Sequence, residues 1–348
     1  MKVGIVGAGR TGRGFLARLL YGQAGIAFFD RDASLIARLN ARGSYAVRFF
    51  DATPEVLVSG FEAYHIQDPR VRGVLPGCDL ILTSVRGENG PEAGRWILDN
   101  APADIPVVAC ENAVVPSDTL GEPLAKVAGS GAVFCTTVTD GPLDILSESY
   151  PSLHASDCAA SGVLARLKGF VVEPDFSTLM ARKIYTYNAA SGIIAYLGAA
   201  MGIESYPEAA NHPAIERELD EFYREVNAAI CAQFCVERGV QDQFAAFSKK
   251  KFQNRAIHDS IERNAASPLR KLGADERIIA PMRLIQRHGG AARPLIKTAA
   301  AALHYLGATE ESAGEVLAET SGLNRGEPMY RAILEAFLKP EPYAQPRI

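Results

Sequence analysis

The sequence predicts an α/β protein in which a doubly wound parallel sheet is followed by a mostly α-helical domain. Two observations predict the sheet: short apolar runs alternate with helical stretches over the first half of the chain, and a glycine-rich turn follows the first run. Long segments of helical periodicity predict the second part. Because single hydrophobic cores stop growing at about 250–300 residues, we expect the 348 residues to form two domains, residues 1–165 and 166–348.

The first domain opens with a strand–helix–strand unit. Residues 2–6 are a β-branched run, residues 11–21 have apolar side chains at helical spacing, and residues 25–30 form a second strand-like run. Later runs are equally short and apolar, as is typical of parallel strands buried on both faces. These runs are residues 78–85, 105–112 and 132–140.

The second domain is predicted from helical periodicity. Prolines and serines concentrate over residues 149–175, where we place the junction between the domains. Beyond it, strand-like runs are few and apolar residues recur at helical spacing. The expected helices are residues 178–201, 214–239, 275–286 and 294–306.

Composition excludes several classes of function. With 48% hydrophobic and 22% charged residues the chain is typical of a globular protein, and a net charge of −4 gives no general attraction for nucleic acid or anionic membranes. It has no apolar run of membrane-spanning length and no secretory signal, so we expect a cytoplasmic protein with neither a nucleic-acid nor a membrane partner. A homodimer is left open. The six cysteines lack a second cysteine or histidine pair at zinc spacing, so no metal is expected.

The glycine-rich turn has the G-x-G-x-x-G pattern of a dinucleotide-binding Rossmann domain. Gly7 allows a tight turn after the first strand, Gly9 lets a pyrophosphate approach the backbone, and Gly12 lets the helix pack against the strand. The helix N-terminus then presents free amides to the phosphates. An ordinary strand-to-helix turn is the alternative.

An acid in the right place strengthens this interpretation. Asp30 ends the second strand, where a carboxylate accepts both ribose hydroxyls of an adenosine and repels a 2′-phosphate. We therefore expect NAD rather than NADP as the cofactor, although Arg31 could pair with a 2′-phosphate.

Other residues of the first domain are also expected at the cofactor. Arg10 lies inside the turn and could face the pyrophosphate or the substrate, whereas Arg13 is expected on a solvated helix face. Three further residues complete the expected cofactor-binding set: Ser84 and Val85, at the end of the 78–85 run, and Asn112.

Acid–base chemistry could come from two segments. Lys183 and Asn188 lie five residues apart in a helical stretch, on adjacent stripes, and burial among apolar neighbours would lower the pKa of the lysine toward neutrality. Asn112 ends the apolar run 105–112, at the carboxyl edge where open sheets bind ligands. On spacing alone a solvated lysine and a packing asparagine are the simpler interpretation, and Asn112 could cap a helix.

Four separated blocks resemble the mannitol dehydrogenase family, the polyol-specific long-chain dehydrogenases. "GAGRTGRGF" (7–15) resembles that family's GAGNIGRGF, and "ACEN" (109–112) its ACEN. Residues 181–198, "ARKIYTYNAASGIIAYLG", resemble its ERKLFTLNTGHAITAYLG. Residues 268–281, "PLRKLGADERIIAP", resemble its PLRKLSAGDRLIKP. The blocks occur in the family's order along nearly the whole chain.

The resemblance implies a reaction and three roles. The lysine that matches Lys183 is the family's general acid/base, and the asparagines that match Asn112 and Asn188 polarise the reacting oxygen. It implies direct hydride transfer to NAD from a secondary alcohol of an open-chain polyol, polyol phosphate or sugar acid, without a metal.

Two departures from the family pattern bear on the substrate. Ser191 stands where the family has a histidine, and Gly141 where it has an arginine. A cation reaching the cleft would pair with a phosphate or carboxylate of the substrate. The expected substrate-side residues are Ser191, Arg86, His258, Arg270 and Lys271.

Two other functions remain open from the sequence. A 3-hydroxyacid dehydrogenase would also combine a Rossmann domain with a lysine and an asparagine on a helical domain. A catalytically silent NAD-binding sensor would keep the fold and tolerate the changes at positions 191 and 141.

Overall fold

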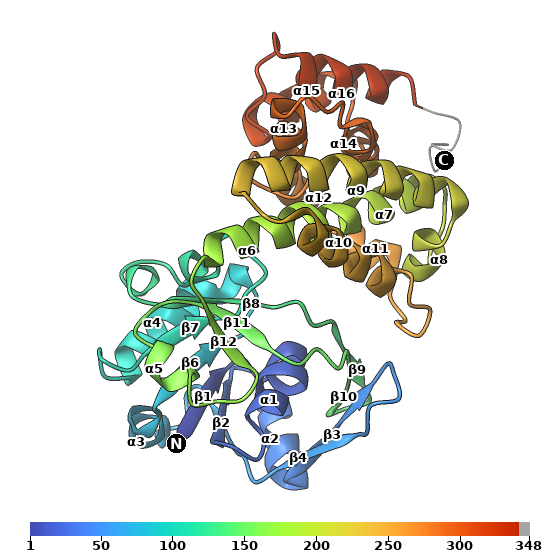
Figure 1. Ribbon diagram of the computed structural model, residues 1–348. Helices are drawn as coiled ribbons and strands as arrows, with labels where there is room; N and C mark the ends of the chain where they lie inside the picture. The colour runs from blue at the N-terminus through green and yellow to red at the C-terminus, as the bar shows by residue number, and fades with distance from the viewer. Residues whose placement is uncertain (341–348) are drawn as a thin grey trace. The chain divides into compact units, whose positions relative to one another are not determined.

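The computed structural model describes residues 1–340, which divide into two compact units (Figure 1). The first unit is Met1–Met180 and the second begins at Ala181. The first unit extends past the predicted boundary at residue 165 because β12 (Phe170–Glu173) pairs with β11 (Leu153–Ser156). Much of the segment that the sequence marks as a junction therefore belongs to the first unit's sheet.

The main sheet of the first unit has the predicted α/β form. Its strands in spatial order are β12, β11, β8 (Gly129–Ala132), β7 (Val107–Ala109), β6 (Leu80–Thr83), β1 (Lys2–Val6), β2 (Gly25–Asp30) and β5 (Glu62–His65). From β8 to β5 all neighbours are parallel, and β11 pairs antiparallel with β8. The predicted fold class is confirmed, with a reversed pair of strands at one edge.

A smaller sheet accompanies the main one. It consists of β4 (Val56–Ser59), β3 (Ser44–Phe49), β10 (Asp144–Ser147) and β9 (Thr137–Asp140). The prediction of one buried parallel strand over 132–140 is wrong. β8 ends at Ala132, and β9 runs antiparallel to β10 with partly exposed side chains. The polar residues Thr137, Thr139 and Asp140 suit such a half-exposed strand better than a buried one.

Two apolar cores cover the two faces of the main sheet. Successive side chains of a strand point to opposite faces, so Ile5 and Phe28 enter one core while Val6 and Phe29 enter the other. The helical elements of this unit are η1 (Gly12–Ala17), α1 (Arg18–Leu20), α2 (Ala33–Arg42), α3 (Val71–Val74), η2 (Leu75–Gly77), η3 (Gly87–Asn89), α4 (Gly90–Asn100), η4 (Pro116–Leu120), η5 (Leu124–Lys126) and α5 (Ser161–Leu164). Burial on both faces explains why the parallel strands have continuous apolar sequences.

The second unit is mostly helical, as predicted. Its elements follow α6 (Phe176–Arg182) and are η6 (Lys183–Asn188), α7 (Ala189–Ala200), α8 (Tyr206–Ala210), α9 (Pro213–Phe234), α10 (Arg238–Phe252), α11 (Ile261–Ala265), α12 (Pro268–Lys271), α13 (Ile279–Arg287), α14 (Arg293–Leu306), α15 (Glu310–Glu315), η7 (Val316–Thr320) and α16 (Pro328–Leu338). The helix predicted over 214–239 is shorter than expected, because Cys235 adopts a left-handed backbone with φ of 53° and ends α9.

The second unit is built around α7. This helix is buried along most of its length and packs against α9, α11 and α14.

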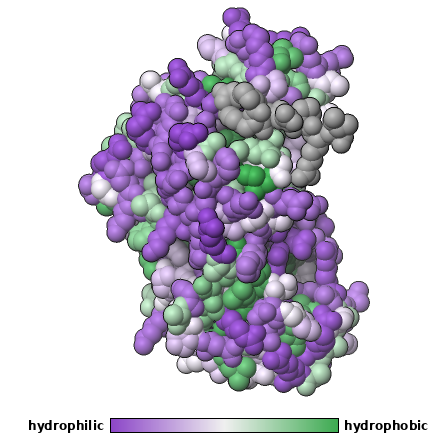
Figure 2. All heavy atoms as spheres, turned by 90° about the vertical axis from the view of Figure 1, so that its right-hand side faces the viewer, coloured by the Kyte–Doolittle hydropathy of each residue, from purple (hydrophilic) through white to green (hydrophobic). Residues whose placement is uncertain are grey.

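Figure 2 shows a face of the molecule on which hydrophilic residues predominate and apolar residues gather in smaller groups. No helix within residues 1–340 is both long enough and apolar enough to cross a membrane.

Candidate functional site

The turn after β1 requires two of its glycines. Gly7 has a φ of +99°, and a Cβ there would lie 2.3 Å from the Ser84 carbonyl oxygen. A Cβ on Gly12 would lie 2.1 Å from the Gly7 carbonyl oxygen. Because contacts shorter than 3.0 Å do not occur at real Cβ atoms, these two positions exclude every larger residue. They hold the helix start close to the strand end.

Gly9 differs from both, because the space that a side chain would occupy there is open. A Cβ built there would meet no other part of the described chain within 4 Å. The opening lies at the start of the helical segment that contains η1, where backbone amides attract anions. A phosphate could approach the backbone here, so the turn fits the pyrophosphate of a dinucleotide.

Arg13 is buried rather than solvated, which corrects the sequence expectation. Its Nη1 donates to the Ala8 carbonyl oxygen, and its Nε donates to the Leu143 carbonyl oxygen at 3.2 Å. The Tyr45 hydroxyl donates to the Arg13 carbonyl oxygen at 3.1 Å. Burial lowers the pKa of Arg13. The arginine ties the glycine turn to the loop before β10, a structural role that sequence spacing does not reveal.

Asp30 is held in place at the carboxyl end of β2. Its Oδ2 accepts from the Ala8 backbone N–H at 2.7 Å and its Oδ1 from the Asp32 N–H at 2.9 Å. These bonds fix a negative charge beside the glycine turn and leave further lone pairs for a ligand. Arg31 points elsewhere: it is exposed and lies 3.6 Å from the Glu92 carboxylate.

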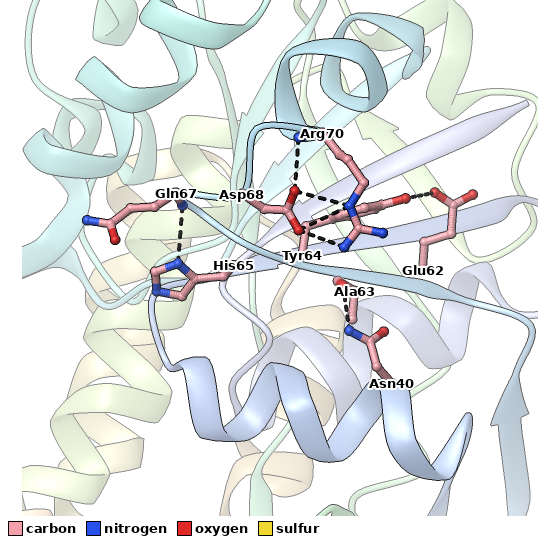
Figure 3. A network of polar contacts seen from close by, with 8 residues as sticks. All are labelled: Asn40, Glu62, Ala63, Tyr64, His65, Gln67, Asp68 and Arg70. Carbon is pink, nitrogen blue, oxygen red and sulfur yellow. Dashed lines mark hydrogen bonds and ion pairs between the residues drawn. The ribbon is translucent and has the colours of Figure 1, made fainter.

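A polar network on β5 supports the loop after Asp30. His65 pairs with Asp30 across the two strands, and its Nε2 lies 3.1 Å from the Arg31 carbonyl oxygen. Figure 3 shows the Gln67 N–H directed at His65 Nδ1, over a distance of 3.3 Å. The figure also shows the ion pair between Asp68 and Arg70 that follows it. β5 is a strand that the sequence pattern does not predict.

The loop after β6 continues the same carboxyl edge. The Ser84 N–H donates to the Val6 carbonyl oxygen at 2.8 Å, and the Val85 N–H donates to Glu111 Oε1 at 2.6 Å. Arg86 has a positive φ of 68°, and its side chain is 78% exposed and 3.9 Å from Glu88. Ser84 and Val85 therefore lie beside the glycine turn, while the Arg86 side chain extends into solvent.

Glu111 is a buried carboxylate that the sequence analysis overlooked. It lies two residues beyond the end of β7, and 4% of its surface is exposed. Burial raises its pKa to about 7, and hydrogen bonds from the backbone N–H groups of Val85 and Arg86 oppose that rise. Asn112 follows it and is exposed. Val115, rather than Asn112, occupies the position before the η4 turn, so the helix-cap alternative for Asn112 is wrong.

Lys183 is buried in the second unit, with 3% of its surface exposed. Burial, together with the positive charges of Arg277 and Lys251, lowers the pKa of Lys183 to about 7, and Glu276 opposes this shift. A neutral amine and an ammonium group are therefore both populated near neutral pH. This is the state that acid–base chemistry requires.

A π-helical turn brings Lys183 and Asn188 to the same side of the helix. In an α-helix, residues five apart point about 140° away from each other. In η6 (Lys183–Asn188) the turns close between residues i and i+5, so the first and last side chains lie nearly one above the other. The expectation of two adjacent stripes is therefore replaced by one shared face. π-Turns inside α-helices are frequent at functional sites.

Neighbouring helices anchor this turn. Gln241 of α10 donates to the Thr186 hydroxyl at 3.0 Å and accepts from Arg182 Nε at 2.9 Å. The Tyr187 ring packs against Phe244 and Phe252, also from α10, with centroids 4.9 and 6.2 Å away. α10 thus holds η6 in its wider form.

The predicted cations of the 268–281 block have structural partners. Arg270 Nη1 lies 2.7 Å from Glu276, and the same carboxylate is 3.3 Å from Arg277 Nε. Lys271 is buried, donates to the Asn264 carbonyl oxygen, and lies 5.7 Å from the centre of the Tyr196 ring. Burial lowers the pKa of Lys271 to about 7. It is Arg277, which the sequence analysis did not single out, whose charge reaches Lys183.

The last two predicted residues differ in exposure. Ser191, on α7, is partly buried. Burial raises the pKa of Tyr206, and Ser191 opposes that rise; the Tyr206 hydroxyl has no well-formed hydrogen bond within the described residues. His258 is exposed in the loop between α10 and α11.

Comparison with known proteins agrees with this architecture. Residues 175–335 match the mannitol dehydrogenase C-terminal domain. A mannitol-1-phosphate 5-dehydrogenase of Paenarthrobacter aurescens is 28% identical over 347 residues, which cover 91% of this chain and 90% of that protein. A substrate-free D-sorbitol dehydrogenase structure matches with a TM-score of 0.73 at 14% identity, over 97% of this chain and 92% of its own. Pseudomonas fluorescens mannitol 2-dehydrogenase, solved with NAD and D-mannitol, matches with a TM-score of 0.68 at 13% identity, over 97% and 90%.

The fold and the relatives define a dehydrogenase, with a Rossmann unit followed by a helical unit that contains a buried lysine. Its residues 175–335 are similar to the mannitol dehydrogenase C-terminal domain. The resemblance predicted from the four sequence blocks is confirmed, and mannitol-1-phosphate 5-dehydrogenases are among the relatives.

Proposed function

We propose that this protein is a cytoplasmic, NAD-dependent dehydrogenase that interconverts a secondary alcohol and a ketone on an open-chain polyol phosphate. The proposal rests on Lys183, a buried lysine on the same helix face as Asn188 with a pKa near neutrality. Free polyols and sugar acids are related substrate classes. They differ from a polyol phosphate only in the group at the end of the carbon chain.

Lys183 would act as the general base in alcohol oxidation. Its neutral amine takes the hydroxyl proton as the C–H bond breaks, and its ammonium form returns a proton in the reverse direction. Burial makes the neutral form available without a metal ion. The nearby charges of Arg277 and Lys251 favour that form further.

Asn188 would stabilise the reacting oxygen. An amide N–H donates to an alkoxide or to a ketone oxygen and stays neutral throughout, so it stabilises negative charge as it develops. The π-turn holds this amide on the side of the lysine. By its resemblance to the family, Asn112 supplies a second amide donor in the reaction.

The first unit has the features that NAD requires. The Asp30 carboxylate, fixed by the Ala8 and Asp32 amides, suits the ribose hydroxyls of an adenosine and repels a 2′-phosphate. The opening at Gly9 suits the pyrophosphate. When bound, the cofactor supplies the hydride acceptor for alcohol oxidation.

The positive charges near Lys183 support the proposal that the substrate carries a phosphate. Arg277 and Lys251 place two cations within electrostatic reach of Lys183, so an anionic group near the reacting alcohol would be attracted. A mannitol-1-phosphate 5-dehydrogenase among the relatives points to the same class.

The test is a substrate panel measured by NADH formation, with NAD and NADP in parallel. The panel contains mannitol 1-phosphate, mannitol, an aldonic acid and a 3-hydroxy acid. We expect turnover of mannitol 1-phosphate with NAD, at least about tenfold lower kcat/KM for mannitol because the charge pairing is lost, and weak use of NADP. Preferred oxidation of the 3-hydroxy acid would overturn the polyol assignment. NADH binding without any turnover would favour a silent sensor.

A further inference from the structure

Glu111 is a buried charged group for which the proposed chemistry has no use. It lies two residues beyond the end of β7, and β7 is two strands away from β1, which precedes the glycine turn, in the order β1, β6, β7. Its Oε1 accepts the Val85 N–H at 2.6 Å, and the Arg86 N–H also interacts with the carboxylate. The carboxylate therefore joins the carboxyl ends of two neighbouring strands and supports the residue with a positive φ, Arg86.

The sheet order places Glu111 on a defined side of the cofactor edge. A dinucleotide lies across the carboxyl ends of the strands, with its two nucleotides on either side of the central strand. Asp30 ends β2 on one side of β1 and has the features of an adenosine site. The other nucleotide then belongs to the side of β6 and β7, where Glu111 lies.

The two redox forms of the cofactor differ in charge at that nucleotide. The oxidised nicotinamide ring is cationic and the reduced ring is neutral, whereas the rest of the molecule is unchanged. A buried carboxylate interacts with a nearby charge much more strongly than an exposed one does, because the surroundings screen it less. A negative charge at the carboxyl ends of β6 and β7 therefore attracts the oxidised form and leaves the binding of the reduced form nearly unchanged.

We propose that Glu111 is a positioning residue that makes the first unit prefer oxidised over reduced dinucleotide, by its charge and by holding the loop after β6. This inference rests on the proposed function, because it requires the first unit to bind a nicotinamide cofactor. It assigns to the chain a residue that sets the redox preference of binding without touching the reacting atoms.

The surroundings of Glu111 give its charge a simple pH dependence. Its pKa is raised to about 7 by burial. The neighbouring Cys110 thiol is buried, and its own pKa is raised, so it stays neutral. The Arg86 side chain is largely exposed and close to Glu88, so it does not neutralise Glu111. The carboxylate is therefore charged above neutral pH and protonated below it.

The experiment compares the dissociation constants of NAD and NADH for the full chain at pH 8 and pH 6. NADH binding is followed by its fluorescence, and NAD binding by displacement of NADH. Because binding of the cation requires the charged carboxylate, the ratio of the NAD to the NADH constant is expected to rise up to about tenfold when the pH falls from 8 to 6. Using the ratio cancels the contributions of the adenosine and the phosphates.

Three variants separate the explanations. Glu111→Gln keeps an oxygen for the Val85 N–H but removes the charge, so its ratio should stay at the acidic wild-type value at both pH values. Asp118→Asn, an exposed carboxylate in η4, should behave as wild type. Lys183→Met removes the lysine that titrates in the same range, and it should leave the rise in the ratio in place.

The outcomes are distinct for this inference and for the proposed function. A pH-independent ratio in the wild type, or an unchanged rise in Glu111→Gln, would overturn the role of Glu111 while leaving the dehydrogenase assignment intact. Failure of the wild type to bind either dinucleotide would overturn both. Loss of the rise in Lys183→Met alone would assign the preference to the lysine.

Discussion

The two units build their candidate sites in different ways, the first from backbone geometry and the second from packed side chains. In the first unit, backbone geometry makes the site: Gly7 and Gly12 allow contacts that a Cβ would block, and two amides hold Asp30. In the second unit, packed side chains make the site: burial and neighbouring charges adjust the pKa of Lys183. A substitution at Gly7 or Gly12 should therefore disturb folding, whereas one at Lys183 should disturb chemistry.

The largest effect is expected from removing the base. Lys183→Met should lower kcat by about a thousandfold, because a positioned general base contributes roughly 10²–10⁴ in rate. NADH affinity should stay within a factor of two of wild type. The melting temperature should not fall, because the substitution removes a buried amine that is costly to charge.

Steady-state kinetics, NADH fluorescence and thermal melts measure these three quantities. The matched control is Lys250→Met, since Lys250 is an exposed lysine on α10 and should keep full activity. Activity retained by Lys183→Met would remove the lysine from the mechanism and weaken the contrast between the two sites.

The next largest effect is expected at the glycine turn. Gly12→Ala should lower the free energy of unfolding by about 3 kcal/mol, because its Cβ would lie 2.1 Å from a backbone oxygen that cannot easily move. Denaturant unfolding measures this change. Gly9→Ala is the matched variant within the same motif: it should leave stability unchanged and weaken NADH binding about tenfold, by blocking the approach of the phosphates.

Gly162→Ala provides a reference without a clash, because that glycine lies in α5 with open space around it, and helix propensity should raise stability by up to about 1 kcal/mol. Equal destabilisation by Gly12→Ala and Gly9→Ala would show that the whole turn is structural, and the distinction between its glycines would then fail.

The smallest effect is a dependence on pH. Because burial lowers the pKa of Lys183 to about 7, the neutral amine becomes scarcer as the pH falls below that value. The kcat/KM for alcohol oxidation should drop about tenfold for each pH unit below 7 and level off above it. Ketone reduction, which needs the ammonium form, should show the opposite trend.

Initial rates in both directions between pH 5.5 and 9 test this expectation, and Lys250→Met should reproduce the wild-type profile. An oxidation rate that still rises about tenfold per pH unit up to pH 9 would mean that the lysine is solvated during catalysis.

The same contrast explains how much the sequence could predict. The spacing of Gly7, Gly9, Gly12 and Asp30 predicts the turn, because those residues are close along the chain and each needs a particular backbone or a particular charge. The helical spacing around Lys183 predicts its helix. Both predictions depend on local patterns, and the structure confirms those elements.

Other features depend on residues far apart in the sequence. Arg13 looks like a surface cation until Leu143 provides its buried acceptor. Glu111 looks like part of a short motif until Val85 donates to it from the loop after β6. The apolar stretch over 132–140 does not reveal that the chain leaves one sheet and enters another within it. Tertiary contacts decide each of these cases.

The π-turn at Lys183–Asn188 has a consequence for the phase of the helix that contains it. Each residue of a regular helix rotates the chain by about 100° around the axis. A wider turn holds one residue more than a regular turn and so changes which residues share a face. Deleting a single residue from this turn would let it tighten to a regular helix. The lysine and the asparagine would then lie four residues apart, about 40° from each other around the axis, and would stay on one face; a regular helix that kept every residue would instead separate them by about 140°.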